Sequence, residues 1–272
     1  MNSAPYRPIV VAVLTVVLVT AAAGKPCQAQ QPLGSPVDLT HAFGDSTIYW
    51  PTADPFQLEV VAHGRTEGGW WYAANSFTTA EHGGTHLDAP IHFAEGKRTA
   101  AEIPLDDLIG PAVVIDVTDA AAADPDLLID VPALEAWEGR NGRIPERSIV
   151  LLWTGWSVRW PDAERYLGTA RRGADAVAGL HFPGLDPAAA GWLVAERAVR
   201  AVGIDTASID RGQSTDFRAH QVLAEADVPI FENVAALERV PPTGAWVVAL
   251  PMKIARGTGG PLRIVAFVPR GP

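Results

Sequence analysis

Short apolar runs recur along the chain, and they predict most of its strands. The runs at residues 112–117 and 148–153 are nearly continuous, which is typical of strands that are covered on both faces. We expect strands at residues 112–117, 148–153, 201–205, 228–232, 246–250 and 262–268. Residues 70–80 alternate aromatic with small polar side chains, which predicts a further strand that leads directly into a histidine-rich segment. A glycine-rich turn at residues 257–260 separates the last two strands.

Helices are predicted between these strands, at residues 132–138, 188–199 and 216–225. The first begins at a proline, and Gly139 after it can end it. The second is rich in alanine and follows Asp186 as N-cap and Pro187 as first helical residue. The chain therefore places helices after several of its buried strands.

Strands alternate with helices and outnumber them, which favours an α/β fold with a mixed β-sheet core and flanking helices. The length of 272 residues and the hydrophobic content of 48% allow one full core, so we expect a single domain over residues 30–272. Residues 31–70 are rich in proline, glycine and aspartate. We expect an irregular arm there, with one strand-like fragment at residues 37–39.

An apolar run from Ile9 to Ala23 precedes this domain. The run is shorter than the ~20 residues that a membrane helix needs. Because it follows Arg7 and ends in small residues, residues 1–29 are predicted to be a secretory signal peptide, and the protein is expected to be exported, periplasmic or extracellular. An uncleaved anchor is one alternative. Lipid modification at Cys27 is another, which the preceding lysine and proline disfavour.

Charge and cysteine content exclude several classes of function. The formal net charge is −10, and an acidic surface argues against nucleic acid or a membrane as partner. The one cysteine, Cys27, lies at the end of the targeting segment, so neither a disulfide framework nor a cysteine nucleophile is expected. The sequence also lacks a Gly-x-Ser-x-Gly elbow, which disfavours serine chemistry.

Residues 81–93, EHGGTHLDAPIHF, contain three of the seven histidines together with two carboxylates. The glycines and the proline in this segment disfavour a helix, and on an extended path His86 and Asp88 point to the same side. His82, His86 and Asp88 can therefore converge on one ion, with a donor set that suits zinc, manganese or iron(II). The alternative is a set of histidines hydrogen-bonded in glycine turns, which a cluster of this density disfavours.

His92 is the fourth member of this cluster, either as a further ligand or as a general acid and base. Imidazole titrates near ~6.5, so it can both accept and return a proton. A bound metal lowers the pKa of water from ~15.7 towards ~7, which makes hydroxide available at neutral pH. As a general base, His92 would accept a proton from that water.

The pattern His-x-Gly-Thr-His-x-Asp-x-Pro-x-His over residues 82–92 resembles the signature of the metal-dependent cyclase-like hydrolases. That family includes bacterial kynurenine formamidases and isatin hydrolases, and the likeness extends over nearly all of residues 37–268. It implies their swivelling β/β/α fold and cleavage of a carbon–nitrogen amide bond. The substrate would be an aryl formamide such as N-formylkynurenine or a cyclic amide such as isatin. A non-catalytic periplasmic relative that binds a small molecule or a metal is the alternative.

The resemblance also implies roles for residues far from this motif. His220 and Glu232 resemble the pair that completes the metal site, and residues 203–210 resemble a second internal motif. From the residues alone, His220 would be interpreted as a surface or capping histidine and Glu232 as a polar strand end. In two-metal relatives the ligands would be His82, His86, Asp88 and Glu232 for one ion, and Asp88, His220 and Glu232 for the other. Trp50 resembles a tryptophan that lines the substrate pocket.

The resemblance further implies one or two zinc or manganese ions, a small-molecule amide substrate, and a homodimer or higher oligomer. A neighbouring subunit would close each pocket. The remaining histidines, His41, His63 and His181, are interpreted as structural, with a position at the border of the pocket as the alternative. Trp70 and Trp71 could form an aromatic wall for a flat substrate.

Overall fold

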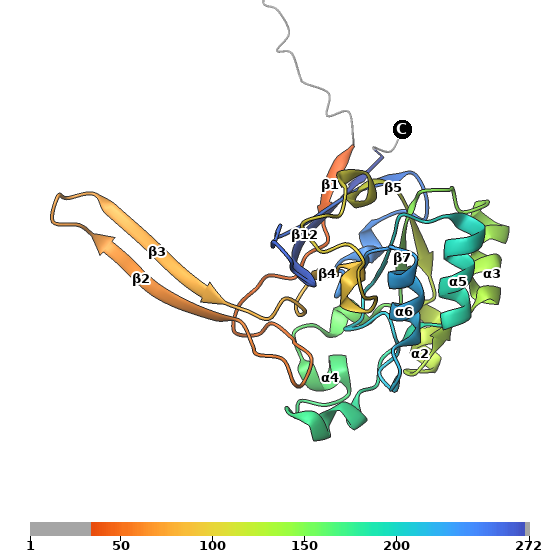
Figure 1. The fold of residues 1–272 in the computed structure, drawn as a ribbon, viewed down its shortest axis with the longest axis horizontal. Coiled ribbons are helices and arrows are strands. Elements are labelled where there is room, and N and C mark those ends of the chain that lie inside the picture. The colour runs from red at the N-terminus through yellow and green to blue at the C-terminus, as the bar shows by residue number, and fades with distance from the viewer. Residues whose placement is uncertain (1–33, 270–272) are drawn as a thin grey trace, which may run out of the picture. The chain divides into compact units, whose positions relative to one another are not determined.

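The computed structural model describes residues 34–269, which form one compact unit (Figure 1). The predicted signal peptide, residues 1–29, lies outside the described residues. Within the described range, every helix is too short or too polar to cross a membrane.

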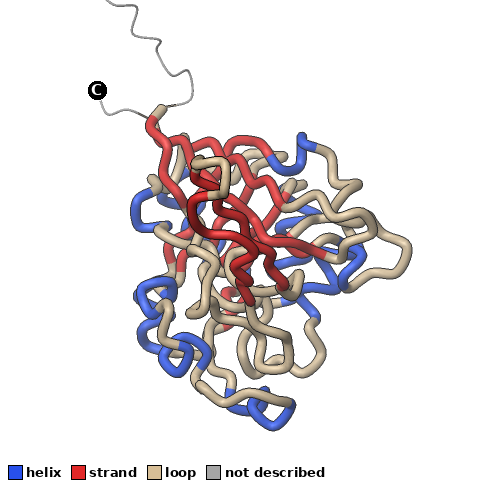
Figure 2. Tube along the Cα trace, turned by 90° about the vertical axis from the view of Figure 1, so that its left-hand side faces the viewer, coloured by secondary structure: helices blue, strands red, loops and turns tan. Residues whose placement is uncertain are grey.

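A mixed sheet forms the centre of this unit (Figure 2). Its eight strands follow the order β1 (Ser35–Asp38), β12 (Gly259–Val268), β11 (Ala245–Pro251), β5 (Ile109–Asp116), β7 (Ile149–Trp153), β9 (Ala201–Ile204), β10 (Ile230–Glu232) and β4 (His86–Asp88). Neighbours from β5 to β10 are parallel, and the other pairs are antiparallel. Because β4 also pairs with β12, the sheet closes on itself, with β1 added beside β12.

Two apolar clusters lie on the two faces of this sheet. One has members from every strand of the closed sheet, including Leu87, Leu151 and Phe231, and it fills the interior. The other lies between the parallel strands and the helices α3 (Val131–Asn141), α5 (Pro187–Arg197) and α6 (Arg218–Glu225). Burial on both faces explains the continuous apolar runs of these strands. The predicted α/β class, with a mixed sheet core and flanking helices, is confirmed.

The three predicted helices form, but α6 begins at Arg218 instead of residue 216, and α5 ends at Arg197 instead of residue 199. α3 extends further than expected. The Asp186 side chain accepts a hydrogen bond from the Ala188 N–H at the start of α5. α3 continues past Gly139 to Asn141 and ends at Gly142, whose φ is 87°. A glycine inside a helix costs only about 1 kcal/mol relative to alanine, which the burial of one face of α3 offsets. The end predicted at Gly139 is therefore wrong.

Shorter elements connect these parts, and the sequence patterns do not predict them. They are α1 (Leu105–Leu108), α2 (Thr118–Ala123), α4 (Ala163–Leu167), β6 (Leu128–Ile129), β8 (Gly184–Leu185) and four 3-10 turns at Pro90–His92, Trp156–Arg159, Ala174–Gly179 and Leu237–Arg239.

A two-stranded hairpin, β2 (Gln57–Arg65) and β3 (Trp71–Thr78), projects from the rest of the described unit (Figure 1). The strand predicted at residues 70–80 is confirmed, but the irregular arm predicted over residues 31–70 is wrong where β2 lies. The proline, glycine and aspartate residues on either side of β2 dominate the average composition of residues 31–70. That average therefore does not reveal the valines of β2. The segment becomes a strand because it pairs with β3 across a short turn.

Candidate metal centre and substrate pocket

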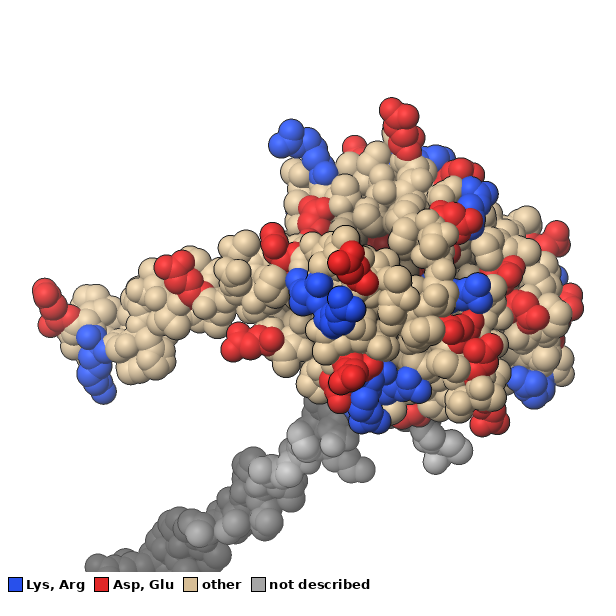
Figure 3. All heavy atoms as spheres, turned by 90° about the horizontal axis from the view of Figure 1, so that it is seen from below, with Lys and Arg blue, Asp and Glu red and all other residues tan. Residues whose placement is uncertain are grey.

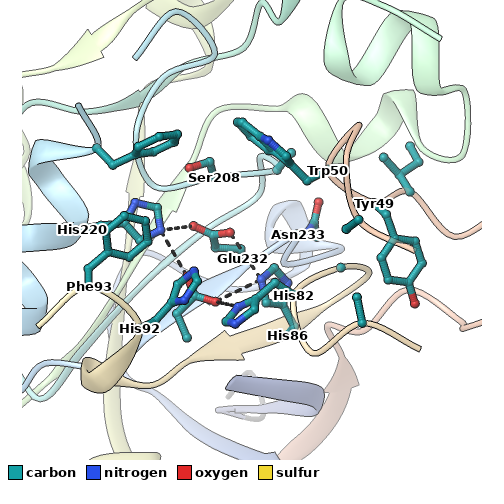
Figure 4. A pocket seen from close by; sticks show the side chains of 17 residues that line it. Tyr49, Trp50, His82, His86, His92, Phe93, Ser208, His220, Glu232 and Asn233 are labelled. Carbon is teal, nitrogen blue, oxygen red and sulfur yellow. Dashed lines mark hydrogen bonds and ion pairs between the residues drawn. The ribbon is translucent and has the colours of Figure 1, made fainter. Parts of the chain in front are cut away.

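The register of β4 brings the predicted ligands together. In the antiparallel pair β4–β10, His86 lies opposite Glu232, although the two are far apart in the sequence. His86 and Asp88 are two residues apart on an extended strand, so both point to the same side. One cavity of about 260 Å³ is lined by all the predicted site residues, namely Trp50, His82, His86, Asp88, His92, His220 and Glu232 (Figure 4).

His86 is oriented by the glycine turn before it. Its Nδ1 lies 2.9 Å from the carbonyl oxygen of Gly84, to which the Nδ1–H donates. Gly84 has a φ of 57°, a conformation that favours glycine. The His86 Nε2 then points at two buried carboxylates, 3.1 Å from Asp88 Oδ1 and 3.4 Å from Glu232 Oε2. Burial opposes the charged form, but these two carboxylates outweigh it and raise the pKa of His86.

His82 also lies beside Asp88. Its Nδ1 is 2.6 Å from Asp88 Oδ1, the same oxygen that faces His86. Its Nε2 is 2.8 Å from the hydroxyl of Thr258. Burial would raise the pKa of Asp88, but three histidines, His82, His220 and His86, hold it well below its usual range. Asp88 is therefore an ionised carboxylate at the centre of the cluster.

His220, on α6, completes the cluster from the opposite side. Its Nδ1–H donates to Asp210 Oδ2 over 2.6 Å. Its Nε2 lies 3.1 Å from both Asp88 Oδ2 and Glu232 Oε1. Burial opposes protonation, but these three carboxylates raise the pKa of His220 well above its ordinary value. Asp210 also accepts the backbone N–H groups of Ala219 and His220, which fixes it at the start of α6.

The two central carboxylates divide the cluster into two donor sets. Asp88 and Glu232 each turn one oxygen towards His86 and the other towards His220. The ligand atoms of His86, Asp88 and Glu232 lie within 4.8 Å of one another. Imidazole nitrogens whose other ring nitrogen donates to a carbonyl or a carboxylate are typical of metal-binding histidines. These residues fit one or two divalent cations that accept nitrogen and oxygen ligands.

His92 lies beside these donor sets. Its ring stacks on His82 with centroids 3.8 Å apart and an angle of 15° between the planes (Figure 4). Its donor atom also lies within 4.8 Å of those of His82 and Asp88, so position alone allows a ligand or a proton carrier. Burial, the largest effect, lowers the pKa of His92 to about 4. The imidazole is therefore neutral at pH 7 and can accept a proton.

Aromatic rings form much of the remaining cavity wall. The Trp50 ring lies 6.1 Å from the Phe217 ring, and Phe93 lies 5.6 Å from Phe217. Sequence reasoning missed Phe93 and Phe217, for which the available signal was their position next to His92 and close to His220. Among the described residues that line the cavity, none is a lysine or an arginine.

Several further candidates lie away from this cavity, namely His41, His63, His181, Trp70 and Trp71. Trp70 and Trp71 are 63% and 59% exposed at the hairpin. The prediction that these tryptophans form an aromatic wall is therefore wrong for the chain's own pocket. The reason is that β2 and β3 pair with each other and take these side chains away from the sheet.

Sequence reasoning also missed two residues that hold the ligands in place. Asp210 contacts Nδ1 of His220, and Thr258 contacts Nε2 of His82. In each histidine this is the ring nitrogen that faces away from the two central carboxylates. Asp210 belongs to residues 203–210, whose resemblance to a family motif was an available signal. Thr258 belongs to a glycine-rich turn, and the sequence of that turn indicates only that it connects two strands.

Comparisons with known proteins show which family this chain resembles. The family model described as "Putative cyclase" matches residues 37–211. The chain is 33% identical to isatin hydrolase from Roseibium aggregatum over 208 residues, which cover 74% of this chain and 76% of that protein. It is 28% identical to kynurenine formamidase from Salinibacter ruber over 232 residues, with coverage of 84% and 95%. Isatin hydrolase A from Ralstonia solanacearum has a similar structure, with a TM-score of 0.77, 34% identity and coverage of 86% and 92%.

Proposed function

The chain belongs to the cyclase family, and from this premise we propose that it is a metal-dependent amide hydrolase. The observation that supports this most directly is the arrangement of Asp88 and Glu232, whose oxygens face the buried His86 and His220 and the partly exposed His82. A divalent cation held by these residues would supply a water of lowered pKa and would polarise a carbonyl oxygen. Zinc and manganese both suit this donor set.

His92 is assigned the proton transfer in this proposal. Its neutral imidazole takes a proton from the attacking water as the new carbon–oxygen bond forms. It then delivers the proton to the amide nitrogen as the carbon–nitrogen bond breaks, which yields a carboxylate and an amine. Stacking on His82 and the edge contact with Phe93, whose centroid is 4.5 Å away, hold the plane of the His92 ring.

The cavity wall favours a neutral aromatic amide as the substrate. Trp50, Phe93 and Phe217 present apolar rings to a flat molecule. The amino-acid end of N-formylkynurenine carries a carboxylate, which a buried site normally pairs with a cationic side chain. Since no lysine or arginine lines the cavity within the described chain, we propose a cyclic aryl amide such as isatin as the preferred substrate.

A chelator experiment tests this function. The protein is stripped of metal, reloaded with zinc or manganese, and assayed with isatin and N-formylkynurenine in parallel. We expect hydrolysis only in the reloaded protein, with kcat/KM for isatin at least about tenfold higher, a difference of about 1.4 kcal/mol. Binding of less than one metal equivalent, with neither amide consumed, would contradict the proposal.

We also propose that the protein is a homodimer built on the hairpin. In the register of β2 and β3, Leu58 lies opposite Phe77, and Val60 is on the same face. These side chains are 54%, 51% and 63% exposed, and Figure 3 shows few charged side chains along this arm between its base and its tip. A two-stranded hairpin is at best marginally stable alone in water, and an apolar face of this kind marks a protein contact. A second copy of the chain would cover it.

A further inference from the structure

The glycine-rich turn at residues 257–260 lies directly against the loop that bears the predicted metal ligands. Gly259 pairs with Asp88 in the β12–β4 register, and the Ala89 N–H donates to the Thr258 carbonyl oxygen over 2.8 Å. A Cβ on Gly259 would lie 2.6 Å from Cε1 of His82 and 2.4 Å from the Leu87 carbonyl oxygen. The turn therefore has a glycine where the His82 ring requires space.

Beside Gly259, the Thr258 hydroxyl lies between His82 and Glu81. Its Oγ1 is 2.8 Å from His82 Nε2 and 2.6 Å from Glu81 Oε2. The backbone N–H of Thr258 donates to the same Glu81 oxygen over 2.9 Å. A carboxylate only accepts hydrogen bonds, so the hydroxyl gives its single proton to Glu81. The hydroxyl oxygen must then accept from His82, which places a proton on Nε2.

A proton on Nε2 makes Nδ1 of His82, 2.6 Å from Asp88 Oδ1, the nitrogen that would hold a cation shared with this carboxylate. His86 and His220 have the opposite arrangement, because their Nδ1–H groups donate to Gly84 and to Asp210. We propose that Glu81 and Thr258 are positioning residues that make His82 an Nδ1 metal ligand, whereas His86 and His220 are Nε2 ligands. The inference rests on the proposed function, since it requires that the site binds a metal.

Glu81 also affects the electronic character of His82, through the hydroxyl of Thr258. A carboxylate that accepts a proton from the second nitrogen of a ligating histidine, directly or through a hydroxyl, increases the basicity of the first nitrogen. Loss of such a partner typically weakens metal binding by about 10–100-fold. Neither Glu81 nor Thr258 lines the cavity, so their replacement leaves the substrate wall unchanged.

The first test measures zinc affinity by competition with a chromophoric chelator. Thr258→Val keeps the side-chain volume and removes the hydroxyl, and we expect it to weaken zinc binding at least about tenfold. Thr258→Ser restores the hydroxyl and should bind zinc as the wild type does. The matched control is Thr99→Val, because the Thr99 N–H and hydroxyl make the same contacts to Glu102, 2.9 and 2.8 Å, with no histidine involved. Its zinc affinity should not change.

A second test uses the wild-type protein and so does not depend on the folding of any variant. Side-chain 15N–1H correlation spectra of histidine-labelled, zinc-loaded protein report which ring nitrogen is protonated. We expect one zinc-bound histidine protonated on Nε2, and every other zinc-bound histidine protonated on Nδ1. Zinc-bound histidines that are all protonated on Nδ1 would overturn the inference.

The outcomes separate this inference from the proposed function. Zinc binding that Thr258→Val weakens, without turnover of any amide, would support the positioning role and overturn the hydrolase. Equal zinc affinity of the wild type and Thr258→Val would overturn the positioning role and leave the hydrolase intact. A wild-type protein that binds no zinc or manganese would overturn both.

Discussion

His86 Nε2 lies 3.4 Å from Glu232 Oε2 because the two residues are directly opposite each other in the β4–β10 pair. The backbone of a closed sheet, rather than a flexible loop, therefore sets the distance between these two groups. Glu232 also faces His220 with its other oxygen, so one side chain connects the two halves of the donor set.

Replacement of Glu232 by glutamine tests this connection. The amide oxygen can still accept the Ile209 N–H, which now donates over 2.7 Å to Glu232, but the negative charge between His86 and His220 is lost. We expect metal affinity to fall by more than about 100-fold, beyond the effect of losing an outer partner. Metal content after dialysis measures it. The exposed Glu238→Gln is the control, and full metal content in Glu232→Gln would contradict the role.

Separate roles are expected for His92 and Asp88. His92→Ala should keep its metal while kcat falls by about 10²–10⁴-fold, the usual contribution of a general acid or base. Asp88→Ala should lose the metal, because Asp88 faces His82, His86 and His220. Metal analysis and kinetics on the same preparations decide between the roles. Equal metal loss in both variants would make His92 a ligand instead.

Asp210→Asn is expected to misorient His220. An asparagine can still cap the start of α6, but it cannot accept the Nδ1–H of His220 with a charged oxygen. Metal affinity or kcat/KM should fall by about 10–100-fold. Asp186→Asn is the matched control, since the Asp186 side chain accepts the Ala188 N–H at the start of α5 and asparagine caps about as well. Equal effects of the two changes would show that Asp210 acts only as a helix cap.

Local patterns predict the parts of the site that are close in sequence. His82, His86 and Asp88 could be recognised from their residue types and spacing, because the glycines exclude a helix and an extended path aligns the donors. His220 and Glu232 needed the resemblance, since only the β4–β10 pairing and the position of α6 bring them to Asp88. Pairing between distant segments leaves no mark in the local sequence.

Local patterns likewise predict the strands of the fold but not the pairing between distant strands. The apolar runs predict β5, β7 and β9, which are buried along most of their length, and the final pair β11 and β12, in which buried positions alternate with more exposed ones. Closure of the sheet through β4 and β12 could not be predicted, since β4 is only three residues long and its pairing depends on the whole sheet. The contact between Thr258 and His82 follows from that closure, which explains why sequence reasoning missed it.

Acid should destabilise the protein in part through His41. Burial lowers the pKa of His41 from 6.5 to about 4, and its buried Nε2 has no hydrogen-bond partner among the described residues. Between these pH values the unfolded chain binds a proton that the folded chain does not, so the free energy of unfolding falls as the pH drops through this window. His41→Phe can keep the stack on Trp160, whose centroid is 4.2 Å away. Its Tm should fall less than that of the wild type from pH 7 to pH 5, and an equal fall would contradict the assignment.

The hairpin provides the test of the assembly. Val60 and Phe77 lie on its apolar face, so the double variant Val60→Glu/Phe77→Glu would place charges in the proposed contact between two copies. Burying an unpaired charge is costly, and the variant should therefore be monomeric where the wild type is dimeric. Light scattering after size-exclusion chromatography measures the mass. Ser76→Lys is the control, because it adds a charge on the opposite face, across from Glu59, and should leave the dimer intact. A monomeric wild type, or a double variant that keeps the dimer mass, would exclude the hairpin as the interface.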